Sequence, residues 1–271
     1  MEALQQLENW PVDHVAAAVI APERPLNATF GDTGRVFPLA SVTKLLVAQA
    51  VLVAVEEGAL ELDDPAGPPG ATIAHLLSHA SGLAFETRDA VAEPGTERIY
   101  SSAGYEVLAE AVEDTTGFGF GEYLRESVAA PLGMTATTLD GPAGHGASST
   151  VDDLALFTAD LLTPRLLSPQ TAAGARSVQF PGIDGFVPGY GKFRPNDWGL
   201  GPELKGAKNR HWTAQSHSPA TFGHFGQSGT YLWVDPVRRA GAVVLTDRPF
   251  GAWAKPLWSD FNQSILAELD D

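Results

Sequence analysis

Near both ends of the chain, unbroken apolar runs predict buried β-strands. The first run is HVAAAVIAP at 14–22, and the short segment ATFGD at 28–32 is a possible partner strand. The other two runs are GTYLWVDP at 229–236 and RAGAVVLTDR at 239–248, which are joined by the polar turn DPVRRAG. We therefore expect one sheet that is assembled from the two ends of the chain.

The middle of the chain has the spacing of helices. Residues 42–55 are apolar on nearly every side, which is typical of a helix buried in a core, and Gly58 stands where a glycine ends such a helix. A further helix at 149–162 begins with Ser149 or Thr150 as its cap. Other helical segments lie at 72–83, 103–117, 121–133 and 258–271. Between 180 and 209, Gly and Pro are dense, so the sequence predicts no definite helix or strand there.

These elements predict an α/β (α+β) protein that forms one compact unit with two lobes. The α/β lobe covers about 1–38 and 186–271, and a mostly helical lobe covers about 39–185. No internal repeat and no flexible linker divides the 271 residues, so we expect a single domain.

Composition narrows the classes of function. The chain has no Cys, which excludes disulfides, thiolate metal sites and cysteine nucleophiles. A net charge of −16 disfavours nucleic acids and anionic membranes as partners. No apolar run is long enough for a membrane span, and the acidic N-terminus lacks the pattern of a signal peptide. We expect a cytoplasmic protein, with a secreted protein that has lost its leader as the alternative.

Ser41 and Lys44 stand three residues apart at the start of the apolar helix. Because positions i and i+3 share a helix face, both side chains are expected within hydrogen-bond range. A serine hydroxyl attacks well only when a base takes its proton. A lysine can be that base when burial and a helix N-terminus lower its pKa. The alternative is a solvated charge at a helix end.

Tyr100 and Ser102 lie just before a helix, where a loop could direct both hydroxyls into a cleft. A tyrosine beside a cationic lysine can have a lowered pKa and relay protons. Alternatively, the ring of Tyr100 packs in the core and Ser101 or Ser102 caps the helix.

His224 lies among glycines at 223, 226 and 229, directly before an expected strand. Such glycines let a backbone approach a ligand and direct its N–H groups at an oxyanion. The alternative is a tight turn with a surface histidine.

In this order, the three motifs resemble the serine β-lactamase and penicillin-binding protein superfamily. The middle motif is of the Tyr type and the third is His-x-Gly, a combination similar to the class C β-lactamase branch with its D-alanyl carboxypeptidases and esterases. Five stretches between Phe37 and Asp247 agree with that branch in order: FPLASVTKLL, HLLSHASGL, PLGMTATTL, DWGLG and GHFGQSGTYLWVDP. The resemblance implies a β-lactamase-like fold, with an antiparallel sheet, flanking helices and a helical lobe.

The resemblance also implies roles for the site residues. Ser41 would be the acylated nucleophile, Lys44 its base, and Tyr100 a relay that protonates the leaving group and helps to activate the deacylating water. The backbone N–H groups of Ser41 and Gln227 would form the oxyanion hole. The remaining substrate-binding positions would be Ser102, His224 and Gly226. The resemblance implies no cofactor and no metal.

Three departures from the family pattern affect the expected substrate. Ser102 stands where Asn usually ends the middle motif, and it offers one donor rather than two. His224 replaces Lys, so positive charge there depends on pH, and Phe225 removes a hydroxyl where Thr is common. We therefore expect a serine hydrolase that acts on small-molecule esters or amides, with slow β-lactam turnover at best.

Other classes of function remain open. One is a non-catalytic binding or sensor domain on the same fold. A second is a metal hydrolase, because His75 and His79 lie four residues apart and could share a helix face; the Glu of the zinc-protease motif is missing, however, and no third ligand stands out. An α/β-hydrolase is disfavoured, because no serine has glycines at both required offsets.

Overall fold

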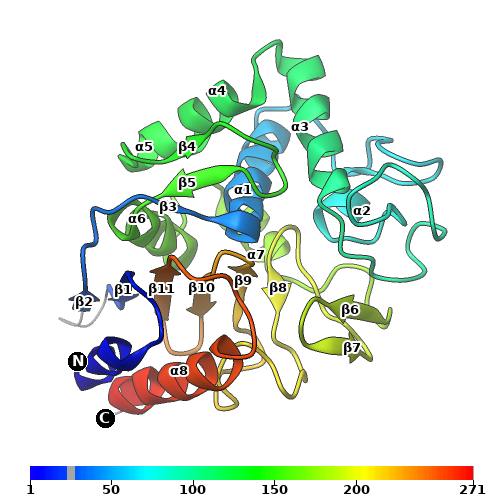
Figure 1. Ribbon diagram of the computed structural model, residues 1–271. Coiled ribbons are helices and arrows are strands. Elements are labelled where there is room, and N and C mark those ends of the chain that lie inside the picture. Colours follow the sequence, from blue (N-terminus) through cyan, green and yellow to red (C-terminus); the bar gives the residue numbers. More distant parts are fainter. Residues whose placement is uncertain (23–27, 271) are drawn as a thin grey trace.

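The centre of the molecule is a six-stranded antiparallel sheet whose strands come from both ends of the chain, as predicted (Figure 1). The computed structural model describes residues 1–22 and 28–270. The strand order is β2-β1-β11-β10-β9-β8. The bounds are β1 Val15–Ile20, β2 Ala28–Phe30, β8 Glu203–Leu204, β9 Phe222–Gly226, β10 Thr230–Asp235 and β11 Ala240–Thr246.

Both faces of this sheet are covered, which explains why its strands are continuously apolar rather than alternating. Every residue of β10 and β11 is buried. Ala18 and Val243 pack in the core with helices α1 and α6, whereas their neighbours Val19 and Val244 pack in a second core with α8 and the N-terminal 3-10 helix. The sheet therefore lies between two helical layers (Figure 1).

Most helices lie close to the predicted segments, whereas the N-terminal 3-10 helix and the helix Pro169–Ala175 match no predicted helix. The helices are the N-terminal 3-10 helix Glu2–Asn9, α1 Thr43–Glu56, α2 Ile73–Leu77, α3 Ala103–Thr116, α4 Phe120–Leu124, α5 Ala130–Leu132, α6 Val151–Leu162, α7 Pro169–Ala175 and α8 Ala254–Asp270. A π-helical turn, Arg125–Ala129, joins α4 to α5. Gly58 has a φ of +76°, a left-handed conformation that favours glycine after a helix end, as expected.

Several boundaries differ from the prediction. The segment at 72–83 is helical only over α2, and α8 starts at Ala254 rather than at Trp258. Of the two caps predicted for α6, Thr150 is the observed one, because its Oγ1 accepts a hydrogen bond from the backbone N–H of Asp153 at 3.1 Å. The stretch rich in Gly and Pro contains the hairpin β6 Gly185–Val187 and β7 Gly191–Phe193.

A small second sheet includes the strand that lies directly before Ser41 in the chain. It pairs β3 Phe37–Pro38 with β5 Ala147–Ser149, and β5 with β4 Thr138–Leu139. No helix in the described ranges is long and apolar enough to cross a membrane. The division into two lobes stays a prediction; α6, from the expected helical lobe, packs directly against β1 and β11.

The side-chain amide of Asn262 is buried between α8 and the sheet, and its removal is expected to lower the stability of the protein. The Oδ1 atom of Asn262 accepts hydrogen bonds from the Tyr231 hydroxyl at 3.0 Å and the Trp233 indole N–H at 2.9 Å. In Asn262→Leu, both donors are left unpaired inside the core. We expect the free energy of unfolding to fall by about 2–4 kcal/mol, measured by urea denaturation.

A matched control introduces the same side chain on the exposed side of the same helix. Ala267→Leu should change the free energy of unfolding by less than about 0.5 kcal/mol, because Ala267 is exposed. Equal stability of Asn262→Leu and the wild type would show that the amide does not hold α8 on the sheet.

Candidate active site

Ser41 lies in a single 3-10 turn, Ala40–Val42, that leads into α1. The turn follows β3 and is held by the hairpin between β9 and β10: Ser228 Oγ donates to the carbonyl of Pro38 at 2.7 Å, and Thr230 Oγ1 donates to that of Leu39 at 2.9 Å. Ala40 has a φ of +46°, which is uncommon for a residue with a side chain. Backbone strain is therefore concentrated next to the expected nucleophile.

Gly226 lies at the end of β9, where the strand touches this turn. A Cβ atom at Gly226 would come within 2.3 Å of the Leu39 carbonyl oxygen, so a side chain there would push the strand away from Ser41. Glycine at 226 thus lets the backbone of β9 approach the turn that carries Ser41.

Lys44 occupies the first turn of α1, and its side chain is fully buried. Its Nζ atom donates to the carbonyl of Gly144 at 2.6 Å and to Ser102 Oγ at 3.1 Å, and it lies 4.7 Å from the centre of the Tyr100 ring. Burial lowers the pKa of Lys44 to about 7, although the negative charge of Glu106 raises it. The neutral and charged forms therefore coexist at neutral pH, unlike in a solvated lysine.

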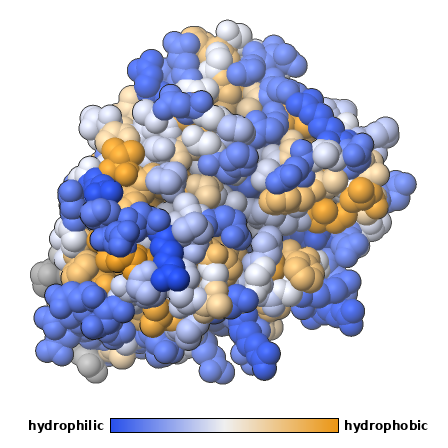
Figure 2. All heavy atoms as spheres, in the orientation of Figure 1, coloured by the Kyte–Doolittle hydropathy of each residue, from blue (hydrophilic) through white to orange (hydrophobic). Residues whose placement is uncertain are grey.

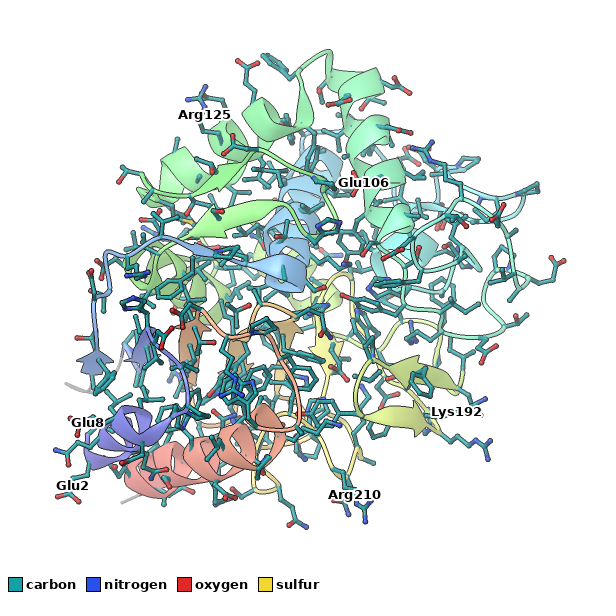
Figure 3. All side chains as sticks on the ribbon, in the orientation of Figure 1. Glu2, Glu8, Glu106, Arg125, Lys192 and Arg210 are labelled. Carbon is teal, nitrogen blue, oxygen red and sulfur yellow. The ribbon has the colours of Figure 1, made fainter. Side chains whose placement is uncertain are left out.

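Glu106 positions the carbonyl that holds Lys44. Its carboxylate accepts hydrogen bonds from the backbone N–H groups of Ala143 at 3.0 Å and Gly144 at 2.8 Å. The side chain projects from α3 beside α1 (Figure 3). Glu106 therefore affects Lys44 both through its charge and through the loop that it holds.

Tyr100 lies in the loop before α3, as expected. Its hydroxyl shares a hydrogen bond with the side chain of Ser41 and lies 3.4 Å from His224 Nε2. The expected lowering of its pKa by Lys44 is wrong: burial raises the pKa of Tyr100 above its ordinary value. The buried phenolate would lose its hydration, so Tyr100 keeps its proton at neutral pH.

Ser102 contributes its side chain to the site rather than to a helix cap. Although it is the residue before α3, it makes no side-chain cap. Ser101 Oγ instead accepts from the backbone N–H of Gly104 at 3.0 Å. The hydroxyl of Ser102 is consequently available to Lys44.

His224 is a buried residue inside β9, not a surface residue before a strand. Its Nδ1 atom lies 2.7 Å from the Phe225 carbonyl, which can only accept, so Nδ1 carries the proton and Nε2 faces Tyr100 as an acceptor. Burial, followed by the positive charge of Lys44, lowers the pKa of His224 to about 4. The ring is therefore neutral at neutral pH.

Ser41, Tyr100 and His224 line a cleft of about 360 Å³. Its lining comes from distant parts of the chain: Ser41, Phe85, Tyr100, Val187, Pro188, Trp198, Glu203, His224, Phe225 and Gln227. In the described part of the chain, the backbone N–H groups of Ser41 and Gln227 donate no hydrogen bond, which leaves both for an oxyanion. Figure 2 shows apolar residues over the loops that follow α2. Phe85 lies in these loops and remains 47% exposed at the cleft.

Glu203 is a cleft residue that sequence reasoning missed. Its carboxylate accepts from the Trp212 indole N–H at 2.8 Å and lies 3.1 Å from both Lys208 Nζ and His211 Nε2. Burial opposes ionisation, but the charge of Lys208 and the contacts of His211 and Trp212 hold the pKa of Glu203 far below its ordinary value. The cleft thus contains a permanent buried carboxylate.

The two histidines that follow β8, His211 and His217, do not add positive charge beside His224. Burial lowers the pKa of His211, and it lowers the pKa of His217 to about 3. Both rings are therefore neutral at neutral pH.

Arg98 anchors the loop that carries Tyr100. It is 2% exposed, and its guanidinium donates to the carbonyls of Ser78, Gln179 at 2.8 Å and Asn196 at 2.6 Å. Arg98 thereby holds three backbone segments against the loop, two residues before Tyr100.

The premise of a metal site at His75 and His79 is wrong. His75 lies in α2, but His79 lies beyond the end of that helix with a φ of +58°, so the two rings share no helix face. The Nδ1 atom of His79 accepts from the Ser101 backbone N–H at 3.1 Å. Within 1–22 and 28–270, no group of three or more His, Cys, Asp or Glu residues could hold a metal.

Comparisons with known proteins test the fold and the family resemblance. The sequence matches the Beta-lactamase family over residues 12–266. A crystal structure of a beta-lactamase from Mycobacterium bovis is 57% identical, with a TM-score of 0.97 over 98% of this chain and 99% of that one. The fold prediction and the family resemblance are therefore confirmed.

Two curated relatives are more distant. The D-alanyl-D-alanine-carboxypeptidase/endopeptidase AmpH of Escherichia coli is 26% identical over 42% of this chain and 40% of its own length. Esterase EstB of Burkholderia gladioli is 36% identical over 35% of this chain and 26% of its own length. The chain spans less than half the length of these relatives.

The pairing of Glu106 with the Lys44 loop predicts a change in titration. In Glu106→Gln, the negative charge that raises the pKa of Lys44 is lost, so we expect that pKa to fall below about 7. The ¹³Cε shift of Lys44, assigned by its disappearance in Lys44→Met, should then titrate at a lower pH than in the wild type.

Glu110→Gln is the matched control, because it removes the same charge from an exposed position of the same helix, where Glu110 pairs with Arg88. It should leave the Lys44 titration unchanged. Identical titrations in Glu106→Gln and the wild type would contradict the proposed influence of Glu106.

Proposed function

The chain belongs to the Beta-lactamase family, and on that premise we propose that it is a serine hydrolase that forms an acyl-enzyme on Ser41. The observation that carries the proposal is the state of Lys44. Its amine is fully buried, donates hydrogen bonds to a carbonyl and a hydroxyl, has a pKa of about 7 and lies one helical turn from Ser41. A buried lysine of this kind is suited to accept a proton from a serine.

In the first half of the proposed reaction, Ser41 attacks the substrate and the leaving group departs. Neutral Lys44 accepts the proton of Ser41 while Ser41 Oγ bonds to the carbonyl carbon of the substrate. The carbonyl oxygen becomes an oxyanion that the N–H groups of Ser41 and Gln227 bind. When the oxyanion collapses, the bond to the leaving group breaks and Tyr100 donates its proton to that group. Charged Lys44 then returns a proton to Tyr100.

The second half releases the acyl group. A water molecule attacks the acyl carbon while neutral Lys44, through Tyr100, accepts the water's proton. Collapse of this second oxyanion breaks the bond to Ser41 Oγ, which recovers a proton, and releases the carboxylic acid. The raised pKa of Tyr100 supports a hydroxyl that carries a proton between groups without remaining ionised.

The charges of the cleft favour uncharged substrates. Glu203 is ionised and His224 is neutral, so the described residues that line the cleft include no cation that would pair with a substrate carboxylate. Phe85, Trp198 and Phe225 supply apolar surface. We infer that small neutral esters react faster than β-lactams, which carry a carboxylate. The names of the relatives, esterase and beta-lactamase, make both substrate classes the ones to compare.

The assignment of the nucleophile predicts the behaviour of Ser41→Ala. We expect hydrolysis of p-nitrophenyl butyrate to fall at least about 10³-fold, because no acyl-enzyme can form. Wild-type activity should fall as the pH drops below about 7, where Lys44 becomes charged. A fluorophosphonate probe should add one adduct to the wild type and none to Ser41→Ala, as measured by intact mass spectrometry.

Ser177→Ala, at an exposed serine, is the control and should retain full activity and labelling. A wild type that neither hydrolyses esters nor takes the probe would favour the non-catalytic binding domain. Nitrocefin turnover faster than ester turnover would overturn the substrate inference.

The role of Glu203 is tested by comparing a neutral substrate with an anionic one. We expect the wild type to prefer p-nitrophenyl butyrate to the anionic mono-p-nitrophenyl glutarate. In Glu203→Gln, the ratio of the two kcat/KM values should fall by about 5- to 10-fold, because one negative charge leaves the cleft. A ratio of two substrates is unaffected by any loss of folded protein. Glu122→Gln, at an exposed site, should keep the wild-type ratio, and an unchanged ratio in Glu203→Gln would remove Glu203 as a determinant.

A further inference from the structure

A second cavity, of about 500 Å³, lies against a face of α1 other than the one that carries Lys44. Leu45, Ala48 and Leu52 form one wall, since positions i, i+3 and i+7 share a helix face. Leu167, Leu200 and Phe222 are among the residues that close it on other sides. Its walls are mostly apolar, as those of small-molecule sites are.

Three polar side chains interrupt this apolar lining: the buried carboxylate of Asp160, the amide of Gln49 and the guanidinium of Arg176. Asp160, in the last turn of α6, is 1% exposed. Its Oδ1 atom accepts from the backbone N–H groups of Arg165 at 2.9 Å and Leu166 at 3.4 Å, and lies 3.7 Å from Arg165 Nε. Its Oδ2 atom has no hydrogen-bond partner among the residues that the structure describes. A buried carboxylate oxygen without a donor is costly, so its presence calls for a partner.

We propose that this cavity binds a small apolar molecule that carries one primary amine. The ammonium group donates to Asp160 Oδ2, and the apolar body lies against Leu45, Leu52 and Leu200. A charged donor suits this position, because a hydrogen bond between ions in an apolar setting is stronger than one between neutral groups. Gln49, 6% exposed on the same face of α1, offers a second polar group to the amine.

The cavity is separate from the cleft, but residues of one segment, 198–203, line both. Trp198 and Glu203 line the cleft, whereas Leu200 and Pro202 line the cavity, and no lining residue is common to both. Between them, Gly201 packs so closely on α1 that a Cβ atom there would lie 2.4 Å from the Cβ of Ala48. A ligand in the cavity therefore leaves Ser41 accessible, and both sites can be occupied at once.

The test compares hexylamine with hexanoate, which has a similar apolar body but the opposite charge. By isothermal titration calorimetry, we expect saturable binding of hexylamine at millimolar concentrations and at least about 10-fold weaker binding of hexanoate. Hexylamine should bind equally well after Ser41 has reacted with the fluorophosphonate. Loss of binding on acylation would place the amine in the cleft and overturn the proposal.

Variants locate the amine. Asp160→Asn keeps an oxygen for the N–H groups of Arg165 and Leu166 but presents an amide donor to the cavity, so hexylamine should bind at least about 10-fold more weakly. Asp152→Asn, on the exposed side of the same helix, should bind as the wild type does. Ala172→Phe, from the half-buried face of α7, should fill the cavity and abolish binding while ester hydrolysis continues. Equal hexylamine affinity in Asp160→Asn and the wild type, or no binding to the wild type, would overturn the proposal.

Discussion

The site depends on the burial of one amine. Lys44 lies on a helix that is apolar on nearly every side, and no carboxylate contacts its Nζ atom in the described part of the chain. Desolvation disfavours the charged form of such a group, so its pKa falls until the neutral form is populated near pH 7. The carbonyl of Gly144 and the hydroxyl of Ser102 then act as acceptors that orient the amine without fixing its charge. Glu106, which accepts a hydrogen bond from the N–H of Gly144, adds a negative charge that keeps the pKa of Lys44 from falling further.

This arrangement needs several parts of the chain to be held together. Ser41 comes from a strained turn that β9 and β10 fasten through Thr230 and the close approach of Gly226. Tyr100 comes from a loop that Arg98 fastens to three backbone segments. Both devices use hydrogen bonds to main-chain carbonyls, so they fix backbone positions rather than side chains. The groups of the cleft are thus preorganised by rigid surroundings, which is what electrostatic stabilisation of an oxyanion requires.

Features that depend on local pattern could be predicted from the sequence, and features that depend on distant contacts could not. Strands buried on both faces read as continuous apolar runs, so β1, β10 and β11 were predictable. His224 was expected outside a strand, because the glycines around it suggest a loop; in the structure they permit close packing of β9. The pKa of Tyr100 was expected to fall, because a neighbouring lysine was taken as charged and the burial of the phenol was unknown. Glu106 and Glu203 belong to no motif, and only the fold brings them to the site.

The charge of the cleft follows from these distant contacts rather than from the motif residues. At the position of His224, the sequence alone suggested a conditional positive charge; burial and the proximity of Lys44 keep the ring neutral instead. Glu203 remains ionised although it is buried, because Lys208 lies 3.1 Å away and is itself held by the carbonyls of Asp197 and Leu204. The lysine that could have offered positive charge to a substrate is therefore committed to a carboxylate of the protein. The proposed selection against anionic substrates then depends on this buried pair as much as on the histidine that replaces the family's lysine.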